Sequence, residues 1–313
     1  MAAPTPTLRA AARTMLTDAA TGEVLADFHA RAIPSILLRG PALARRLFNA
    51  DETRLYVDAD VLVPPGSQRD AADALAELGF EPVAGDTELA LHRPRHAREW
   101  RRSSDRVSVD LHRTVAGCRA ADGDVWRELH AGSETATVGG QRAMVPGPAG
   151  VVLVVALHAA HNGPRGTKPL GDLERAFERF DPATWADAAA LARRLDAVPA
   201  FSAGVRLRPR GVRLAAELGL PDALPVDVGL RATGAPPLAL GLDWLTQTTG
   251  LRAKAALALH VLAPPPGALR TWRMLARRGA PGLAAAYVSH PFWLARHAVP
   301  SLVALRRARK DAA

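Results

Sequence analysis

The sequence predicts an α+β protein in which an α/β part comes first and an all-helical part follows. Apolar and polar residues alternate with the period of a β-strand at residues 55–63. Other short apolar runs bounded by glycine or proline also fall before residue 147. Beyond Pro148 the apolar residues recur at helical spacing. We therefore predict an α/β domain with an N-terminal helix over residues 1–147 and a helical domain with a basic C-terminal tail over residues 148–313.

The composition favours a folded, cytoplasmic protein. Of the 313 residues 48% are hydrophobic and 23% are charged, which suffices for a sizeable core and argues against wholesale disorder. The single cysteine, Cys118, cannot form an intramolecular disulfide and is expected to be a plain thiol, as suits a reducing cytosol. The longest purely apolar run, residues 151–157, is far shorter than the roughly 18 residues of a membrane span.

The net charge of +9 is compatible with an anionic partner such as nucleic acid, a nucleotide or a membrane surface. Lys168, Lys254 and Lys310 are the only lysines among the 40 basic residues, so arginine supplies nearly all of the positive charge. Such a bias is typical of G+C-rich coding in bacteria. The charge by itself therefore does not identify a polyanionic partner.

The first elements are two helices on either side of a short strand. Apolar residues at helical spacing predict a helix over residues 8–30. The apolar run at 32–38 ends at Gly40 and predicts a buried strand. Pro41 suits the first turn of the helix expected at 42–48.

Turn and cap residues define the remaining elements. Ser67 is a candidate N-cap for a helix over 68–78, which Gly79 would end. Further strands are expected at 55–63, 89–92 and 107–111, and a hairpin at 135–138 and 142–145 around Gly139 and Gly140. Later helices are expected at 151–161, 173–180, 185–195, 212–218 and 251–262.

Two carboxylates share one face of the predicted strand at 55–63. Asp58 and Asp60 alternate with apolar residues, so both side chains point to the same side, about 7 Å apart along the strand. Like charges this close repel each other, and a divalent cation with oxygen ligands, such as Mg²⁺, would remove the repulsion. The alternative is an exposed edge strand with two solvated aspartates. Aspartate is a poor strand former, which favours the metal site.

A third carboxylate lies in the strand predicted at 107–111. Val107, Val109 and Leu111 share one face of that strand, whereas Asp110 shares the other with His112. A third carboxylate on a neighbouring strand would complete a two-metal site, with ions roughly 3.5–4 Å apart.

A third segment, residues 37–41, is a strand that turns into a helix at Gly40. A glycine there lets a phosphate approach the free backbone N–H groups of the helix.

In this order the segments resemble the uncharacterised nucleotidyltransferase family of the polymerase-β-like superfamily. Its members often carry LLKG, then R-x-x-x-D-x-D-x-L-V, then V-D-L-H, and the matching residues here are 37–40, 54–63 and 109–112. Residues 74–80 resemble the family's helix that ends in L-x-x-x-G-[FY], and residues 157–160 and 168–173 resemble a later helical segment with a histidine and an aspartate. The resemblance covers about residues 30–180.

The resemblance implies a polymerase-β-like mixed sheet with flanking helices, followed by an all-helical lobe. It also implies that Asp58, Asp60 and Asp110 are catalytic residues that bind Mg²⁺ or Mn²⁺, and that Gly40 seats the triphosphate of an NTP. Arg39 stands where many relatives have a lysine. The charge is the same, but a planar guanidinium fork replaces a compact ammonium group.

Arg54, Lys168 and His158 are further candidates for nucleotide binding, each with an alternative. Arg54 could bind a phosphate or pair with a carboxylate. Lys168 could reach a phosphate or be a solvated loop lysine. His158 and His161 are three residues apart on one helix, where they could hold a metal or be hydrogen-bonded core or surface residues. Relatives often place the second histidine about four residues after the first, and position 162 is asparagine here.

Two other segments have structural explanations. Asp172 precedes Leu173 and is expected to cap a helix. The stretch over residues 287–310 mixes aromatic and basic side chains, which would suit an anionic surface or a packed helix with a frayed basic tail. Interruption by Pro281, Pro291 and Pro300 favours the packed helix.

The prediction for function is a metal-dependent nucleotidyltransferase that moves an NMP from an NTP to an acceptor hydroxyl or phosphate. The acceptor could be a small molecule, a peptide, a protein or an RNA end, and sequence does not choose among them. One alternative is a catalytically degenerate, nucleotide-binding regulator or scaffold. Another is a basic surface-binding adaptor with an incidental acidic strand.

Overall fold

The computed structural model describes residues 6–49, 52, 54–83 and 96–312 of the chain. The chain divides into two compact units, which are described separately. The N-terminal unit comprises residues 1–82, 96–161 and 166–221, and the C-terminal unit comprises residues 83–95, 162–165 and 222–313. The strand expected at 89–92 lies outside the described residues.

A seven-stranded mixed sheet forms the centre of the N-terminal unit, with the order β3-β4-β5-β2-β1-β7-β6. The β2–β5 and β1–β7 pairs are parallel, and the other pairs are antiparallel. The strands are β1 (Ile36–Leu37), β2 (Asp58–Leu62), β3 (Phe80–Pro82), β4 (Ala97–Arg102), β5 (Ser108–His112), β6 (Ser133–Val138) and β7 (Gln141–Pro146).

The strand alternation predicted for β2 and β5 decides which face of the sheet is apolar. Ala59, Val61, Val107 and Val109 are fully buried in one core cluster. Helices α1 (Pro6–Ala30) and α3 (Gln68–Glu77) contribute their apolar side chains to the same cluster. This core cluster therefore lies on the face opposite Asp58, Asp60 and Asp110, and those carboxylates point away from it.

The strand predicted at 55–63 is shorter in the structure and begins at Asp58. The alternation at residues 55–63 predicts that Leu55 and Val57 share the buried face with Ala59 and Val61, but they are 41% and 52% exposed. Tyr56 is buried instead, and its hydroxyl donates a hydrogen bond to the Asp18 carboxylate at 2.6 Å. Packing of Tyr56 against α1 reverses the alternation before the sheet begins, so the expectation for Leu55 and Val57 is wrong.

The predicted hairpin is confirmed as β6 and β7. Gly139 and Gly140 have φ values of 52° and 78°, as a two-residue type I′ turn requires. A Cβ on Gly139 would lie 2.3 Å from the Asp18 carbonyl oxygen, and one on Gly22 would lie 2.4 Å from the Gly139 carbonyl oxygen. Two glycines thus let α1 approach the turn of the hairpin.

The other helices of the N-terminal unit follow or surround the sheet. Pro41 begins α2, and Gly79, with φ 81°, follows α3, both as predicted. These helices are α2 (Pro41–Leu47), α5 (Asp122–Ala131), α6 (Pro148–Asn162), α7 (Thr167–Arg179), α8 (Pro182–Arg194), α9 (Val198–Val205) and α10 (Pro209–Glu217). Strands give way to helices after Pro146, so the predicted fold class is confirmed. The domain boundary at residue 147 stays a prediction.

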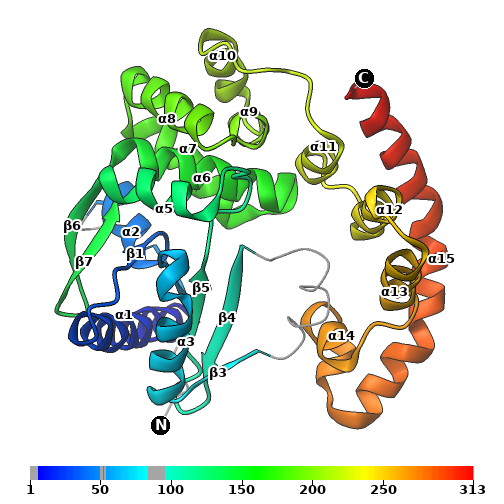
Figure 1. Ribbon diagram of the computed structural model, residues 1–313, viewed down its shortest axis with the longest axis horizontal. Coiled ribbons are helices and arrows are strands. Elements are labelled where there is room, and N and C mark those ends of the chain that lie inside the picture. Colours follow the sequence, from blue (N-terminus) through cyan, green and yellow to red (C-terminus); the bar gives the residue numbers. More distant parts are fainter. Residues whose placement is uncertain (1–5, 50–51, 53, 84–95, 313) are drawn as a thin grey trace. The chain divides into compact units, whose positions relative to one another are not determined.

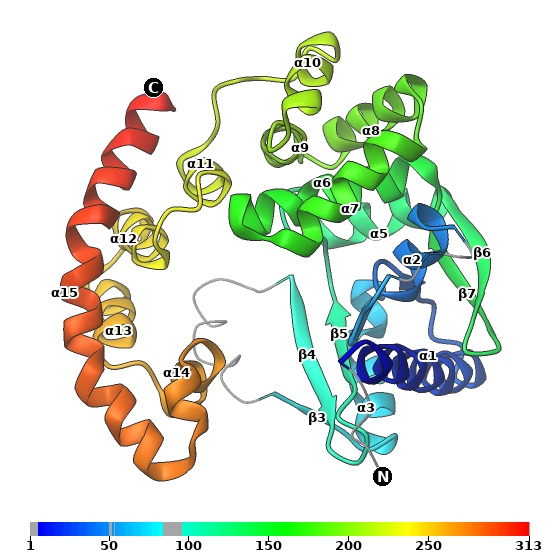
Figure 2. The same ribbon diagram turned by 180° about the vertical axis from the view of Figure 1, so that it is seen from behind.

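The described part of the C-terminal unit is helical. Helix α15 runs beside the other helices of this unit (Figure 1, and from behind in Figure 2). The helices are α11 (Val226–Ala232), α12 (Pro237–Gln247), α13 (Leu251–Leu262), α14 (Pro266–Trp272) and α15 (Gly279–Asp311). Among the described helices, none is both long and apolar enough to span a membrane.

The prolines expected to interrupt the C-terminal segment do not end its helix. Pro281 lies in the first turn of α15, where a backbone N–H has no helical partner. Pro291 and Pro300 lie inside the helix and each removes one helical hydrogen bond. The neighbouring residues His290 and Ser301 are buried, so packing against the other helices of the unit outweighs these losses.

Candidate active site

Two parallel strands bring the predicted carboxylates together. In the register of β2 and β5, Asp60 lies opposite Asp110, and Leu62 lies opposite His112. Side chains of neighbouring strands at matched positions point to the same face of a sheet. Asp58, two residues before Asp60, also belongs to this face. The alternation visible in the sequence therefore places all three carboxylates on one side.

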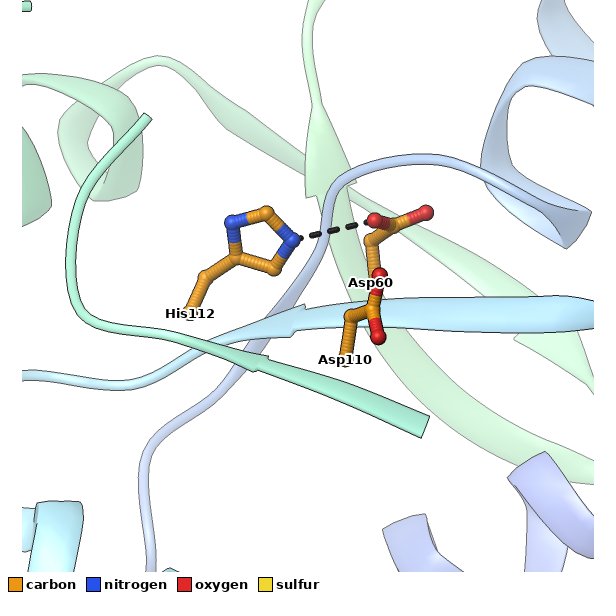
Figure 3. A group of neighbouring side chains, drawn as sticks. All are labelled: Asp60, Asp110 and His112. Atoms are coloured by element: carbon orange, nitrogen blue, oxygen red, sulfur yellow. Dashed lines mark hydrogen bonds and ion pairs between the residues drawn. The ribbon is translucent and has the colours of Figure 1, made fainter. Parts of the chain in front are cut away.

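Among the described residues, Asp60, Asp110 and His112 form a group of potential metal ligands (Figure 3). Each offers one ligand atom, and these atoms all lie within 4.8 Å of one another. Asp58 is not part of that group, but its charge acts on Asp110. His112 belongs to the V-D-L-H segment, yet sequence reasoning assigned it no role.

His112 is held by contacts at both ring nitrogens. Nε2 lies 3.0 Å from Oδ1 of Asp60, and Nδ1 lies 3.2 Å from the carbonyl oxygen of Thr114. The side chain is almost fully buried, with 3% of its surface exposed. These contacts leave the ring little freedom to turn, and they aim Nε2 at the carboxylate pair.

Arg39 supplies the positive charge nearest to Asp60. It follows the strand β1 and forms an ion pair with Oδ1 of Asp60. Burial by itself would raise the pKa of Asp60, but the Arg39 charge and the contact with His112 outweigh it and hold that pKa below its ordinary value. Asp60 is therefore an ionised, buried carboxylate.

The same surroundings shift the pKa of Asp110 in the opposite direction. Burial, together with the negative charges of Asp60 and Asp58, raises the pKa of Asp110 to about 7. Arg39 lowers it by a smaller amount. The sheet face that carries Asp58, Asp60 and Asp110 thus has more negative charge than the neighbouring basic side chains neutralise. A divalent cation would remove that imbalance.

Gly40 allows β1 and α2 to meet β2 at close range. Its backbone has φ 61° and ψ −116°, a conformation that disfavours residues with a Cβ. A Cβ at this position would lie 2.6 Å from the carbonyl oxygen of Asp58. Gly40 therefore brings the start of α2 beside Asp58, where the sequence predicts the triphosphate.

A buried ion pair joins α7 to the region of Gly40. Arg54 donates hydrogen bonds to both carboxylate oxygens of Asp172, at 2.8 and 2.6 Å, and a third to the Gly40 carbonyl at 3.2 Å. Of the two alternatives for Arg54, the structure shows the pairing with a carboxylate, and phosphate binding stays a prediction. Asp172 lies inside α7, whose N-cap is Gly166, so the expectation of a helix cap is wrong.

Histidines from three segments lie beside the carboxylates. The His96 ring centroid lies 5.5 Å from that of His112 and 5.2 Å from that of His161. His158, on the same helix as His161, interacts electrostatically with Arg39 and Asp60. Burial lowers the pKa of His158 to about 2 and that of His96 to about 3, so both rings are neutral near pH 7.

Sequence reasoning missed His96 because it did not detect β4. His96 immediately precedes that strand, and Ala97 pairs with His112 across β4 and β5. Only the pairing of β4 with β5 shows that His96 lies close to His112.

Lys168 lies in the first turn of α7, not in a loop. The side chain keeps much of its surface exposed. Partial burial lowers the pKa of its amine, followed by the charge of Arg54, whereas Asp58 acts in the opposite direction. Lys168 therefore feels the charges of the carboxylate face, and its role as a nucleotide ligand stays a prediction.

Comparisons with known proteins give a family and a likeness to solved structures. The profile of a family described as uncharacterised nucleotidyltransferase matches residues 5–210. The solution structure of the antibiotic-resistance factor ANT(2'')-Ia is similar at 16% identity and a TM-score of 0.42, and the match covers 60% of this chain and 95% of that chain. No curated protein matches. The family profile covers β1–β7 and every residue of the carboxylate face, so the chain belongs to the uncharacterised nucleotidyltransferase family.

Proposed function

We propose that this protein transfers a nucleoside monophosphate from an NTP to an acceptor hydroxyl or phosphate. The observation that carries the proposal is the pairing of Asp60 with Asp110 on parallel strands, with Asp58 on the same face, inside the segment that matches the family. Nucleotidyl transfer needs such a concentration of oxygen ligands, because the triphosphate and the acceptor must both be held close to cations.

The donor set fits one or two divalent cations. Asp58, Asp60 and Asp110 would hold them as oxygen ligands, which suits Mg²⁺ or Mn²⁺. Burial, followed by repulsion from Asp60 and Asp58, raises the pKa of Asp110, and a bound cation would relieve that repulsion. When bound, such ions neutralise developing charge on the phosphates and polarise the attacking oxygen.

The residues around the carboxylates have roles in binding the nucleotide. Gly40 leaves the backbone at the start of α2 open to the triphosphate, and Arg39 stands beside it. Lys168 and His158 interact electrostatically with carboxylates of this face, which supports a role for both in contacting the nucleotide.

Asp110 orients the acceptor oxygen and takes up its proton as that oxygen attacks the α-phosphorus. The bond to the leaving pyrophosphate breaks as the bond to the acceptor forms, so one NTP gives one nucleotidylated acceptor and one pyrophosphate.

The decisive experiment incubates the purified protein with each α-labelled NTP and fractionated lysate. The label is expected in one acceptor fraction, together with pyrophosphate. Asp110→Asn should abolish the transfer while the fold remains intact, because removing this charge relieves repulsion. Asp73→Asn, an exposed residue on α3, is the matched control and should retain the rate.

The outcomes of this experiment separate the alternatives. Equal labelling by wild type and Asp110→Asn would contradict the proposed role of the carboxylates. A ligand-induced rise in melting temperature with Mg²⁺–NTP, without any turnover, would indicate a nucleotide-binding regulator. Absence of both would contradict the proposal.

A further inference from the structure

The two contacts of His112 resemble those of a metal-bound imidazole. The Thr114 carbonyl oxygen can only accept a hydrogen bond, so Nδ1 of His112 carries a hydrogen. Histidines that bind metals commonly donate one ring N–H to a backbone carbonyl, which turns the other nitrogen toward the ion. In His112 that other nitrogen, Nε2, lies 3.0 Å from Oδ1 of Asp60. An ionised carboxylate only accepts hydrogen bonds, so Nε2 donates a hydrogen to Asp60 in the metal-free protein, and a bound ion would replace that hydrogen.

The spacing of the three side chains also fits a single ion. Two neighbouring ligands, each about 2.1 Å from an octahedral ion, lie about 3 Å apart, and two opposite ligands lie about 4.2 Å apart. The Nε2–Oδ1 distance between His112 and Asp60 is 3.0 Å, and all ligand atoms of the group with Asp110 lie within 4.8 Å. Small side-chain rotations therefore suffice to place them around one ion.

The contact with Arg39 does not prevent such binding. Arg39 engages Oδ1 of Asp60. An ionised carboxylate has two oxygens with about four lone-pair sites, so Asp60 can accept from Arg39 and also bind an ion. Asp110 brings a second carboxylate to the same place.

We infer that His112 is a metal ligand, which together with Asp60 and Asp110 holds one ion in a mixed nitrogen–oxygen site. This inference rests on the proposed function, because the ion is one of those that serve nucleotidyl transfer. Imidazole suits divalent transition-metal ions, whereas Mg²⁺ prefers oxygen ligands only. The site therefore favours a divalent transition-metal ion over Mg²⁺, with Mn²⁺ as the paramagnetic probe, and Asp58 remains available for the ion on the triphosphate.

The test is Mn²⁺ binding to the full-length, nucleotide-free protein, followed by electron paramagnetic resonance. Titration is expected to give one tight Mn²⁺ site per chain. Electron spin-echo modulation should then show coupling to ¹⁴N, and labelling with [¹⁵N]histidine should change that modulation. His112→Gln should lose the coupling and weaken Mn²⁺ binding at least tenfold.

Matched variants assign the coupling to one histidine. His161→Gln and His96→Gln remove neighbouring rings that lie outside the three-residue group, and both should retain the coupling. Asp110→Asn should weaken Mn²⁺ binding while keeping any nitrogen signal. If His112→Gln does not fold, coupling in the labelled wild type that persists in His96→Gln, in His161→Gln and in His158→Gln still assigns the ligand to His112, because His158 is the remaining described histidine that interacts electrostatically with Asp60.

The possible results separate this inference from the proposed function. Bound Mn²⁺ without nitrogen coupling, or coupling lost only in His96→Gln or His161→Gln, would overturn the role of His112 even if nucleotidyl transfer is observed. Nitrogen coupling in a protein without transferase activity would overturn the proposed function and leave the mixed site standing. If wild type binds no Mn²⁺, the inference is wrong.

Discussion

Asp110 is a carboxyl group whose ionisation acts against the fold of the metal-free protein. Its pKa is raised to about 7 by burial and by Asp60 and Asp58, whereas the unfolded chain ionises near pH 4. Between these values the unfolded state releases a proton that the folded state keeps, so stability falls as pH rises from about 4 to about 7.

Asp110→Asn should remove this pH-dependent loss of stability. In EDTA the variant should gain stability relative to wild type as pH rises from 4 to 7, by on the order of 1–2 kcal/mol after solvent screening. The measurement is urea denaturation across that pH range, with Asp73→Asn as the control. A pH-independent difference between wild type and Asp110→Asn would contradict the raised pKa.

Gly40 is the residue whose backbone brings α2 to the carboxylates. Gly40→Ala should destabilise the protein by on the order of 1–3 kcal/mol and abolish the thermal shift with Mg²⁺–NTP, because the new Cβ meets the Asp58 carbonyl at 2.6 Å. Gly171→Ala is the control. Gly171 lies in α7 with open space around it, so alanine there should be neutral or slightly stabilising. Equal effects of the two substitutions would contradict the close approach at Gly40.

The attachment of α7 to the carboxylate region depends on the buried pair of Arg54 and Asp172. Arg54→Met leaves the Asp172 charge buried without its partner, and this should cost on the order of 3–5 kcal/mol. Arg54→Met combined with Asp172→Leu should recover most of the loss, because no buried charge remains. Denaturant titration of the single and double variants measures the coupling between the two residues. Additive losses would show that the pair does not act as a unit.

At the scale of the whole molecule, the extent of the N-terminal unit predicts which fragment of the chain folds by itself. Residues 1–221 include the carboxylate face together with α6 and α7, which carry His158 and Asp172. A fragment of residues 1–221 should melt cooperatively and bind Mn²⁺. A fragment of residues 1–147 lacks the partner of Arg54 and the buried helix α6, so it should expose apolar surface and aggregate.

Calorimetry and light scattering of the two fragments give the comparison. A stable, Mn²⁺-binding fragment of residues 1–147 would favour the domain boundary predicted from the sequence. Loss of folding in both fragments would show that the C-terminal unit is needed for the stability of the N-terminal one.

Local backbone geometry accounts for what the sequence by itself determined. Side chains alternate between the two faces of a strand. The apolar residues of β2 and β5 mark the buried face, so the sequence alone predicts that Asp60 and Asp110 point to the opposite face. The turn at Gly139 and Gly140 likewise follows from the conformational freedom of glycine. These features depend on neighbours in the chain, which the sequence displays.

Contacts between distant segments were decided only by the tertiary structure. Arg39 pairs with Asp60, Arg54 pairs with Asp172, and His96 lies beside His112 because the sheet order and the helices bring them together. Such pairs leave no periodic signal in one sequence, since any of many arginines could meet a given aspartate. Burial and charge then act on the assembled group, which is why the raised pKa of Asp110 and the orientation of the His112 ring depend on the folded chain.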